Sequence, residues 1–178
     1  MDILQAIHAR RSIRSYERRP VARDVIEAII LDAAQAPPPF RGQVPWVFNV
    51  IAGRERIAGL GARAMAYAQA GHNPDAPGWG WLGQPDFEIF WGAPVVVIIS
   101  GPLADCCRAG QTLMLSAHAR GLGTCWVGSP LPWLITEAVK GELRIPLPLT
   151  PMAVFCLGYP QATPQAMPKP PPPIIWVD

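Results

Sequence analysis

Apolar residues recur every three or four positions in several stretches of the chain, a spacing that predicts amphipathic helices. Such helices are expected at residues 3–9, 25–33, 54–69, 104–120 and 133–143. Asp2 can cap the first of them, and the prolines that begin at Pro37 prevent the second from continuing. The helix at 104–120 is apolar on nearly every side, so we expect it to be buried.

Short runs of β-branched and aromatic residues predict strands at 46–51, 94–100, 125–128 and 152–157. The run at 94–100 is almost entirely Val and Ile, which is typical of a strand covered on both faces. Helices that alternate with buried strands predict an α/β fold, an α+β sandwich in which helices flank a central mixed β-sheet. Residues 72–83 are rich in Gly, Pro and Trp without periodicity and are a candidate lid or substrate wall.

The length of 178 residues is typical of one domain. We expect a domain at 1–160 and an arm at 161–178, which is rich in proline and ends in apolar residues. Only 16% of the residues are charged, below the roughly 25% of an average soluble domain. A partner subunit is therefore expected to cover part of the surface, with the arm packing on it.

The sequence disfavours several classes of protein. No apolar stretch approaches the roughly 20 residues of a membrane span, and the first residues do not resemble a secretory signal, so a cytoplasmic protein without a membrane partner is expected. A net charge of +2 gives no reason to expect nucleic-acid binding. The four cysteines lack C-x-x-C spacing and the three histidines are isolated, so neither a metal site nor a disulfide framework is predicted.

Positive charge is concentrated where Arg10, Arg11, Ser12 and Arg14 follow the first expected helix. Guanidinium groups offer paired donors that suit a phosphate dianion, and a hydroxyl adds another donor. These four residues are candidate ligands of a terminal phosphate. A solvated basic turn is the alternative interpretation of the same residues.

Four motifs share their order and spacing with one family. The basic run is the first, and residues 36–46 resemble its A-P-S-x-x-N-x-Q-P-W loop, with Gln43 matching and Arg41 at the place of Asn. Residues 90–94 read F-W-G-A-P before the expected central strand, and residues 121–128 read G-L-G-T-C-W-V-G. Together these motifs resemble those of the nitroreductase family over about residues 2–160.

The resemblance implies a homodimeric flavoprotein whose residues 1–160 bind FMN and whose C-terminal arm is exchanged between subunits. It implies an oxidoreductase that takes electrons from NADH or NADPH and passes them, by a ping-pong route, to a small aromatic acceptor such as a nitro compound or a quinone. No side chain is assigned as catalytic, because the cofactor supplies the chemistry.

Cofactor-binding residues follow from the same resemblance. The basic run would hold the phosphate, assisted by Lys169 at the first place of a basic pair whose second place is Pro171. The loop at 36–46 would approach the flavin ring, and small residues at 121–128 would let backbone N–H groups come close to it. The full set is Arg10, Arg11, Ser12, Arg14, Arg41, Gln43, Cys125, Trp126, Val127 and Lys169.

Other functions remain open at this point. The family's fold also supports flavin fragmentation and heterocycle oxidation. A non-catalytic flavin carrier or redox sensor is favoured if the prolines at 38–39 block the ring and Pro171 weakens the phosphate site. A third alternative is a structural dimer whose proline-rich arm binds an SH3-like partner.

Overall fold

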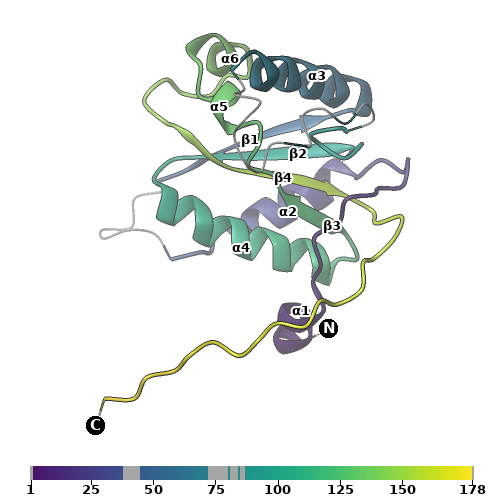
Figure 1. Cartoon of the computed structure of the whole chain (residues 1–178), viewed down its shortest axis with the longest axis vertical. Helices are drawn as coiled ribbons and strands as arrows, with labels where there is room; N and C mark the ends of the chain where they lie inside the picture. Colours follow the sequence, from purple (N-terminus) through teal and green to yellow (C-terminus); the bar gives the residue numbers. More distant parts are fainter. Residues whose placement is uncertain (1, 38–44, 72–79, 81–83, 85–86, 178) are drawn as a thin grey trace.

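The computed structural model describes residues 2–37, 45–71, 80, 84 and 87–177, and it centres on a four-stranded antiparallel sheet in the order β1-β2-β4-β3. The strands are β1 (Val47–Ala52), β2 (Val95–Ser100), β3 (Gly123–Trp126) and β4 (Pro151–Gly158). The helices are α1 (Ile3–Ala9), α2 (Arg23–Ala33), α3 (Arg54–Ala70), α4 (Leu103–Ala119), α5 (Leu131–Leu134) and α6 (Glu137–Glu142). One face of the sheet is covered by α2 and α4, and the other by α3, α5 and α6, which confirms the predicted α/β fold (Figure 1).

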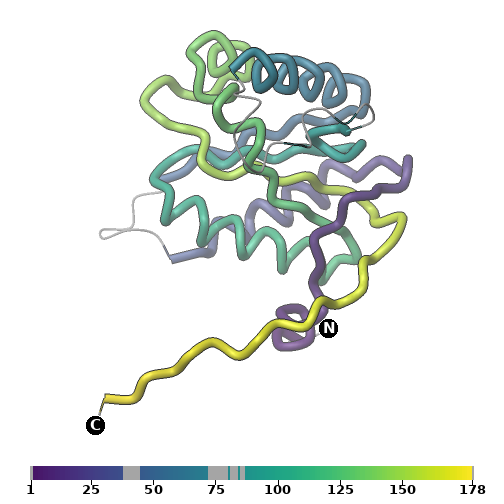
Figure 2. Tube along the Cα trace, in the orientation of Figure 1, coloured from purple at the N-terminus to yellow at the C-terminus, as the bar shows by residue number. Residues whose placement is uncertain are grey.

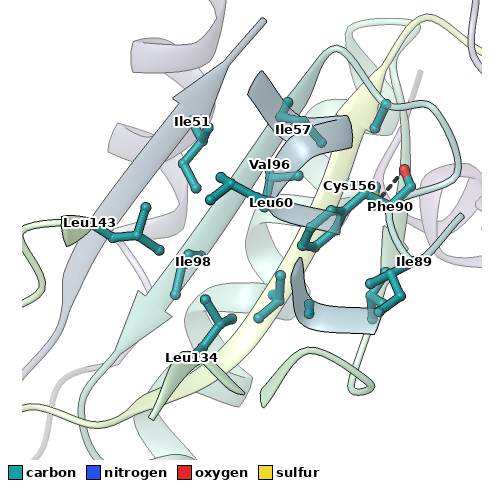
Figure 3. Packing of buried hydrophobic residues seen from close by; sticks show 14 of the residues in the cluster. Ile51, Ile57, Leu60, Ile89, Phe90, Val96, Ile98, Leu134, Leu143 and Cys156 are labelled. Carbon is teal, nitrogen blue, oxygen red and sulfur yellow. Dashed lines mark hydrogen bonds between the residues drawn. The ribbon is translucent and has the colours of Figure 1, made fainter. Parts of the chain in front are cut away.

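Strand β2 is the centre of the core, and all six of its residues are buried. It pairs with β1 on one side and β4 on the other. Val96 and Ile98 point toward α3, where they pack with Ile57 and Leu60 (Figure 3). The other Val and Ile side chains of β2 pack with α2 and α4. Burial on both faces explains the continuous Val and Ile run in the sequence.

The segment after α1 lies beside β3. A parallel bridge joins Ser12 to Thr124, and an antiparallel bridge joins Tyr16 to Pro160. The three ladders between the four strands are antiparallel. In the part of the chain that the structure describes, the mixed character expected for the sheet therefore comes only from the Ser12 bridge.

Two expected elements differ from those observed. The strand expected at 125–128 begins earlier, because Gly123 and Thr124 already pair with β4. The helix expected at 133–143 is divided into α5 and α6, because Thr136 between them has an extended backbone with ψ of 141°. Helix α4 ends close to the expected place, and Gly121 has the positive φ of 75° that a helix-ending glycine permits.

Residues 161–177 form an extended arm that runs past α1 and away from the sheet (Figures 1 and 2). All of them are exposed, including Ile175 at 86% and Trp176 at 82%. On α1, Ile3 and Leu4 are exposed as well. Although these surfaces are apolar, none of the helices in the described ranges is long and apolar enough to cross a membrane.

Candidate functional site

Residues 10–17, here called the basic segment, are held against the edge of β3. The Ile13 N–H donates a hydrogen bond of 2.9 Å to the carbonyl of Thr124. Gly123 permits this approach, since a Cβ at that position would lie 2.4 Å from Ile13 Cγ1. Ile13 is buried, Ser12 is half-buried and Arg14 is exposed. Docking of the segment therefore presents its polar side chains along the edge of the sheet.

The basic segment is fixed a second time after Arg14. The Gln161 N–H donates to the Ser15 carbonyl over 3.0 Å. The buried Tyr16 hydroxyl donates to the Ile13 carbonyl over 2.7 Å, and burial raises the pKa of Tyr16, so the phenol remains a donor. Arg14 therefore extends from a stretch of backbone that is anchored on both sides.

Arg10, Arg11 and Arg14 form a basic edge beside β3, and none of them pairs with a carboxylate among the described residues. The chain has no acidic residue from position 3 to 16. Burial lowers the pKa of His118 at the end of α4, and the charges of Arg10 and Arg11 lower it further. The basic edge is thus a concentration of positive charge without a counter-ion in the described part of the chain.

Arg14 links the basic edge to two other motifs. Its Cζ lies 5.7 Å from the centre of the Trp91 ring, a cation–π geometry. Burial raises the pKa of the Cys125 thiol, and the charge of Arg14 opposes that rise. The fold therefore brings together the basic run, the F-W-G-A-P motif and the start of the C-W-V-G motif.

The residues at the end of β3 point in alternating directions. Cys125 and Val127 are buried in the core beneath α3. Trp126 is 38% exposed, and its ring packs on Phe155 with centroids 5.2 Å apart. A Cβ on Gly128 would meet nothing within 4 Å. The open surface here consists of the Trp126 ring and the backbone at Gly128, whereas Cys125 and Val127 turn their side chains inward.

A family model described as the nitroreductase family matches residues 7–159, a range that includes the basic segment, Trp91 and β3. The chain belongs to the nitroreductase family. A protein of Methanothermobacter thermautotrophicus, named for NADH dehydrogenase and NAD(P)H nitroreductase, is 32% identical over 92% of this chain and 80% of its own length. A 4-nitrobenzoate reductase of Nocardioides sp. is 29% identical over 88% of this chain and 79% of its own length.

Solved nitroreductase structures share the fold. A Bacteroides fragilis nitroreductase with bound FMN superposes with a TM-score of 0.85 at 23% identity, with both chains covered in full. A Desulfitobacterium hafniense nitroreductase with bound FMN gives a TM-score of 0.84 at 24% identity, again over both chains in full. The fold of this nitroreductase-family chain is therefore one that solved members also have.

Three of the site residues expected from the nitroreductase motifs are not placed at the basic edge, two because they lie outside the described residues and one because it lies in the arm. Arg41 and Gln43 lie outside the described residues. Lys169 is exposed in the arm, which runs away from the sheet of its own subunit (Figure 2). The structure brings together Arg10, Arg11, Ser12 and Arg14 with Cys125, and leaves Lys169 apart.

Sequence reasoning missed one residue of this nitroreductase site. The guanidinium of Arg54, the first residue of α3, donates to the carbonyls of Gly92, Tyr16 and Glu17. In the sequence it is marked only by its place directly after Gly53, the glycine between β1 and α3. An apolar cavity of about 530 Å³ lies next to it, between α3 and residues 87–92.

Proposed function

We propose that this chain is an FMN-dependent NAD(P)H oxidoreductase that acts as a homodimer and passes electrons to a small aromatic acceptor, such as a nitro compound or a quinone. The observation that supports it most directly is the basic edge, where Arg10, Arg11 and Arg14 lie beside β3 without a carboxylate partner in the described chain. The family contains proteins solved with bound FMN.

The basic edge suits the phosphate dianion of FMN. The Nη1 atom of Arg11 donates to the His8 and Arg10 carbonyls over 2.7 and 2.9 Å, so this residue contributes mainly charge. Arg10 and Arg14 keep guanidinium donors for a ligand, and the half-buried Ser12 adds a hydroxyl. Charge-assisted hydrogen bonds of this kind are about twice as strong as neutral ones. We propose that Lys169 reaches the same phosphate through the exchanged arm.

The end of β3 suits a flat ring. Trp126 offers a partly exposed aromatic surface, and the open position at Gly128 leaves backbone that a planar heterocycle can approach. Cys125 and Val127 are buried, so we assign them backbone contacts rather than side-chain contacts. By family resemblance, Arg41 and Gln43 complete the contacts to the ring and ribityl chain.

When bound, FMN supplies hydride transfer at its N5 atom. The side chains of this chain hold and orient the cofactor and exclude water. His118 is kept neutral by its lowered pKa, so it does not add to the positive charge of the basic edge. We assign no acid or base, and we propose that electron donor and acceptor use one pocket in turn.

Dimer formation explains the apolar surface that a single subunit leaves open. Trp176 and Val177 at the tip of the arm are 82% and 93% exposed, and Ile3 of α1 is 62% exposed. Burial of such side chains contributes about 1.5–3 kcal/mol each. We therefore propose that the arm packs on the partner subunit. Four unpaired cysteines agree with a reducing, cytoplasmic location.

The nature of the acceptor is inferred from relatives. The Nocardioides relative is named for the reduction of 4-nitrobenzoate, and the Methanothermobacter relative for NAD(P)H nitroreduction. The first name fits a flat, electron-poor aromatic molecule, and both names fit an acceptor with a nitro group.

The deciding experiment is a visible absorption spectrum of the purified protein with added FMN, followed by anaerobic NADH or NADPH. We expect bound flavin that bleaches with at least one donor and recovers its colour when a nitroaromatic or quinone is added. Arg14→Met should weaken FMN binding. Bound flavin that stays yellow would favour a carrier or sensor, and absence of binding would refute the proposal.

A further inference from the structure

Trp91 has an unusual backbone. Its φ is 56°, and Gly92 after it has a φ of 64°. The left-handed region is disfavoured for a bulky side chain, at a cost of about 1–2 kcal/mol. Such a conformation persists only where neighbouring groups determine it. The contacts of this turn therefore identify the groups that hold the Trp91 backbone in this conformation.

The turn is held by Arg54 from one side. Its Nη1 donates to the Gly92 carbonyl, and its Nη2 donates to the Tyr16 carbonyl over 3.0 Å and to the Glu17 carbonyl. Its Nε is buried without a hydrogen-bond partner in the described chain. One guanidinium therefore ties the turn at Trp91 to the end of the basic segment.

The core holds the turn from the other side. The Trp91 N–H donates to the Glu88 carbonyl over 3.0 Å, and the Cys156 thiol donates to the Phe90 carbonyl over 3.3 Å (Figure 3). Phe87 packs edge-on against the Trp91 ring with centroids 5.0 Å apart. The ring is therefore fixed in direction as well as in place.

This fixed ring lies under Arg14, with the Arg14 Cζ 5.7 Å from its centre. Arg14, Trp91 and Arg54 line a common cavity of about 520 Å³, together with Tyr16, Glu17 and Gln161. Arg54 donates hydrogen bonds to the carbonyls of Tyr16 and Glu17, two and three residues after Arg14. It also donates to the Gly92 carbonyl, in the turn that carries the Trp91 ring. Arg54 thus holds both the backbone that follows Arg14 and the turn whose Trp91 ring contacts the Arg14 guanidinium.

We propose that Arg54 is a positioning residue for the cofactor site: through Trp91 and the carbonyls of Tyr16 and Glu17 it holds the Arg14 guanidinium toward the bound anion. This inference rests on the proposed function for the identity of the ligand. The guanidinium donates to the two segments from two separate nitrogen atoms, Nη1 and Nη2, whereas the three donors of a lysine ammonium share one nitrogen. Arg54 itself does not contact the cofactor.

The test measures the dissociation constant of FMN by quenching of flavin fluorescence, using the full-length protein. Arg54→Met is expected to weaken binding about tenfold, which corresponds to about 1.4 kcal/mol. In an Arg14→Met background, the same substitution should add less than about twofold. A merely structural role would give the same loss in both backgrounds. Arg56→Met, an exposed arginine of the same helix, is the control and should bind FMN like the wild type.

Trp91→Leu keeps all three hydrogen bonds of Arg54 and tests the same contacts if Arg54→Met does not fold. It should also weaken FMN binding, and again should add little to Arg14→Met. Wild-type affinity in both variants, or a loss that persists undiminished without Arg14, would overturn the inference and leave the proposed function intact. A wild-type protein that does not bind FMN would overturn both.

Discussion

Gly123 of β3 lies directly against Ile13 of the basic segment, where a Cβ would stand 2.4 Å from Ile13 Cγ1 and 2.7 Å from Ile13 Cβ. Both atoms belong to a β-branched side chain that is buried and cannot rotate away. The basic segment can therefore dock on the sheet only because position 123 has no side chain.

Gly123→Ala is expected to push the basic segment away from β3. Overpacking of this kind destabilises a protein by about 1–3 kcal/mol. The loss should appear in urea unfolding, and FMN affinity should fall with it because Arg10, Ser12 and Arg14 move together. Gly141→Ala in α6 is the matched control, since a Cβ there meets nothing within 4 Å and alanine favours a helix. A Gly123→Ala protein as stable as the control would contradict this account of the docking.

His118 is expected to make stability depend on pH. Burial and the charges of Arg10 and Arg11 lower its pKa in the folded protein below the ordinary value of 6.5. The unfolded chain therefore binds more protons than the folded protein. The contribution of His118 to stability is complete above pH 6.5 and is lost as the pH falls through the pKa of His118 in the folded protein. His118→Gln should remove this part of the pH dependence in urea unfolding between pH 7 and about 5.

Addition of FMN gives a second test on the same histidine. A bound dianion would offset the charges of Arg10 and Arg11, so the pKa of His118 should rise, as measured by NMR titration of the imidazole. An unchanged or lowered pKa in the presence of saturating FMN would place the phosphate elsewhere.

Much of the fold is predictable because its signals are local. The Val and Ile run of β2 and the helical spacing in α2 and α4 predict buried elements whatever their neighbours are. The division between α5 and α6 was not predictable, because apolar spacing continues through Thr136 while its backbone is extended. The start of β3 was missed because glycine, which disfavours strands, is required there by the contact with Ile13.

The candidate site was predictable as a set of motifs but not as an arrangement. The charge of the arginines at 10, 11 and 14 was enough to predict an anion-binding site. By contrast, the role of Arg54 depends on carbonyls 37 and 38 residues away, and backbone acceptors leave no trace in a sequence. Nor does the alternation of a strand show which of Cys125 and Trp126 faces the core until its partner strand is known.

The thiols are expected to differ in reactivity. Burial raises the pKa of Cys106 to about 11, with Cys107 and Asp105 adding to the shift. Burial also raises the pKa of Cys125 and Cys156. At pH 8 the thiolate fraction of Cys106 is about one in a thousand. Iodoacetamide should therefore modify the half-buried Cys107 first in the native protein, as mass spectrometry would show. Faster modification of Cys125 would contradict the buried environment described for it.

The arm is expected to determine the oligomeric state. Its tip consists of Ile174, Ile175, Trp176 and Val177, and each of these side chains is at least 70% exposed. Trp176→Ala should weaken the proposed dimer, and removal of residues 161–178 should give monomers by light scattering at micromolar concentration. Met167→Ala, another exposed residue of the arm outside the tip, serves as the control. If Lys169 acts through the exchanged arm, the truncated protein should also bind FMN more weakly. A monomeric truncated protein with unchanged FMN affinity would mean that the arm serves in assembly alone.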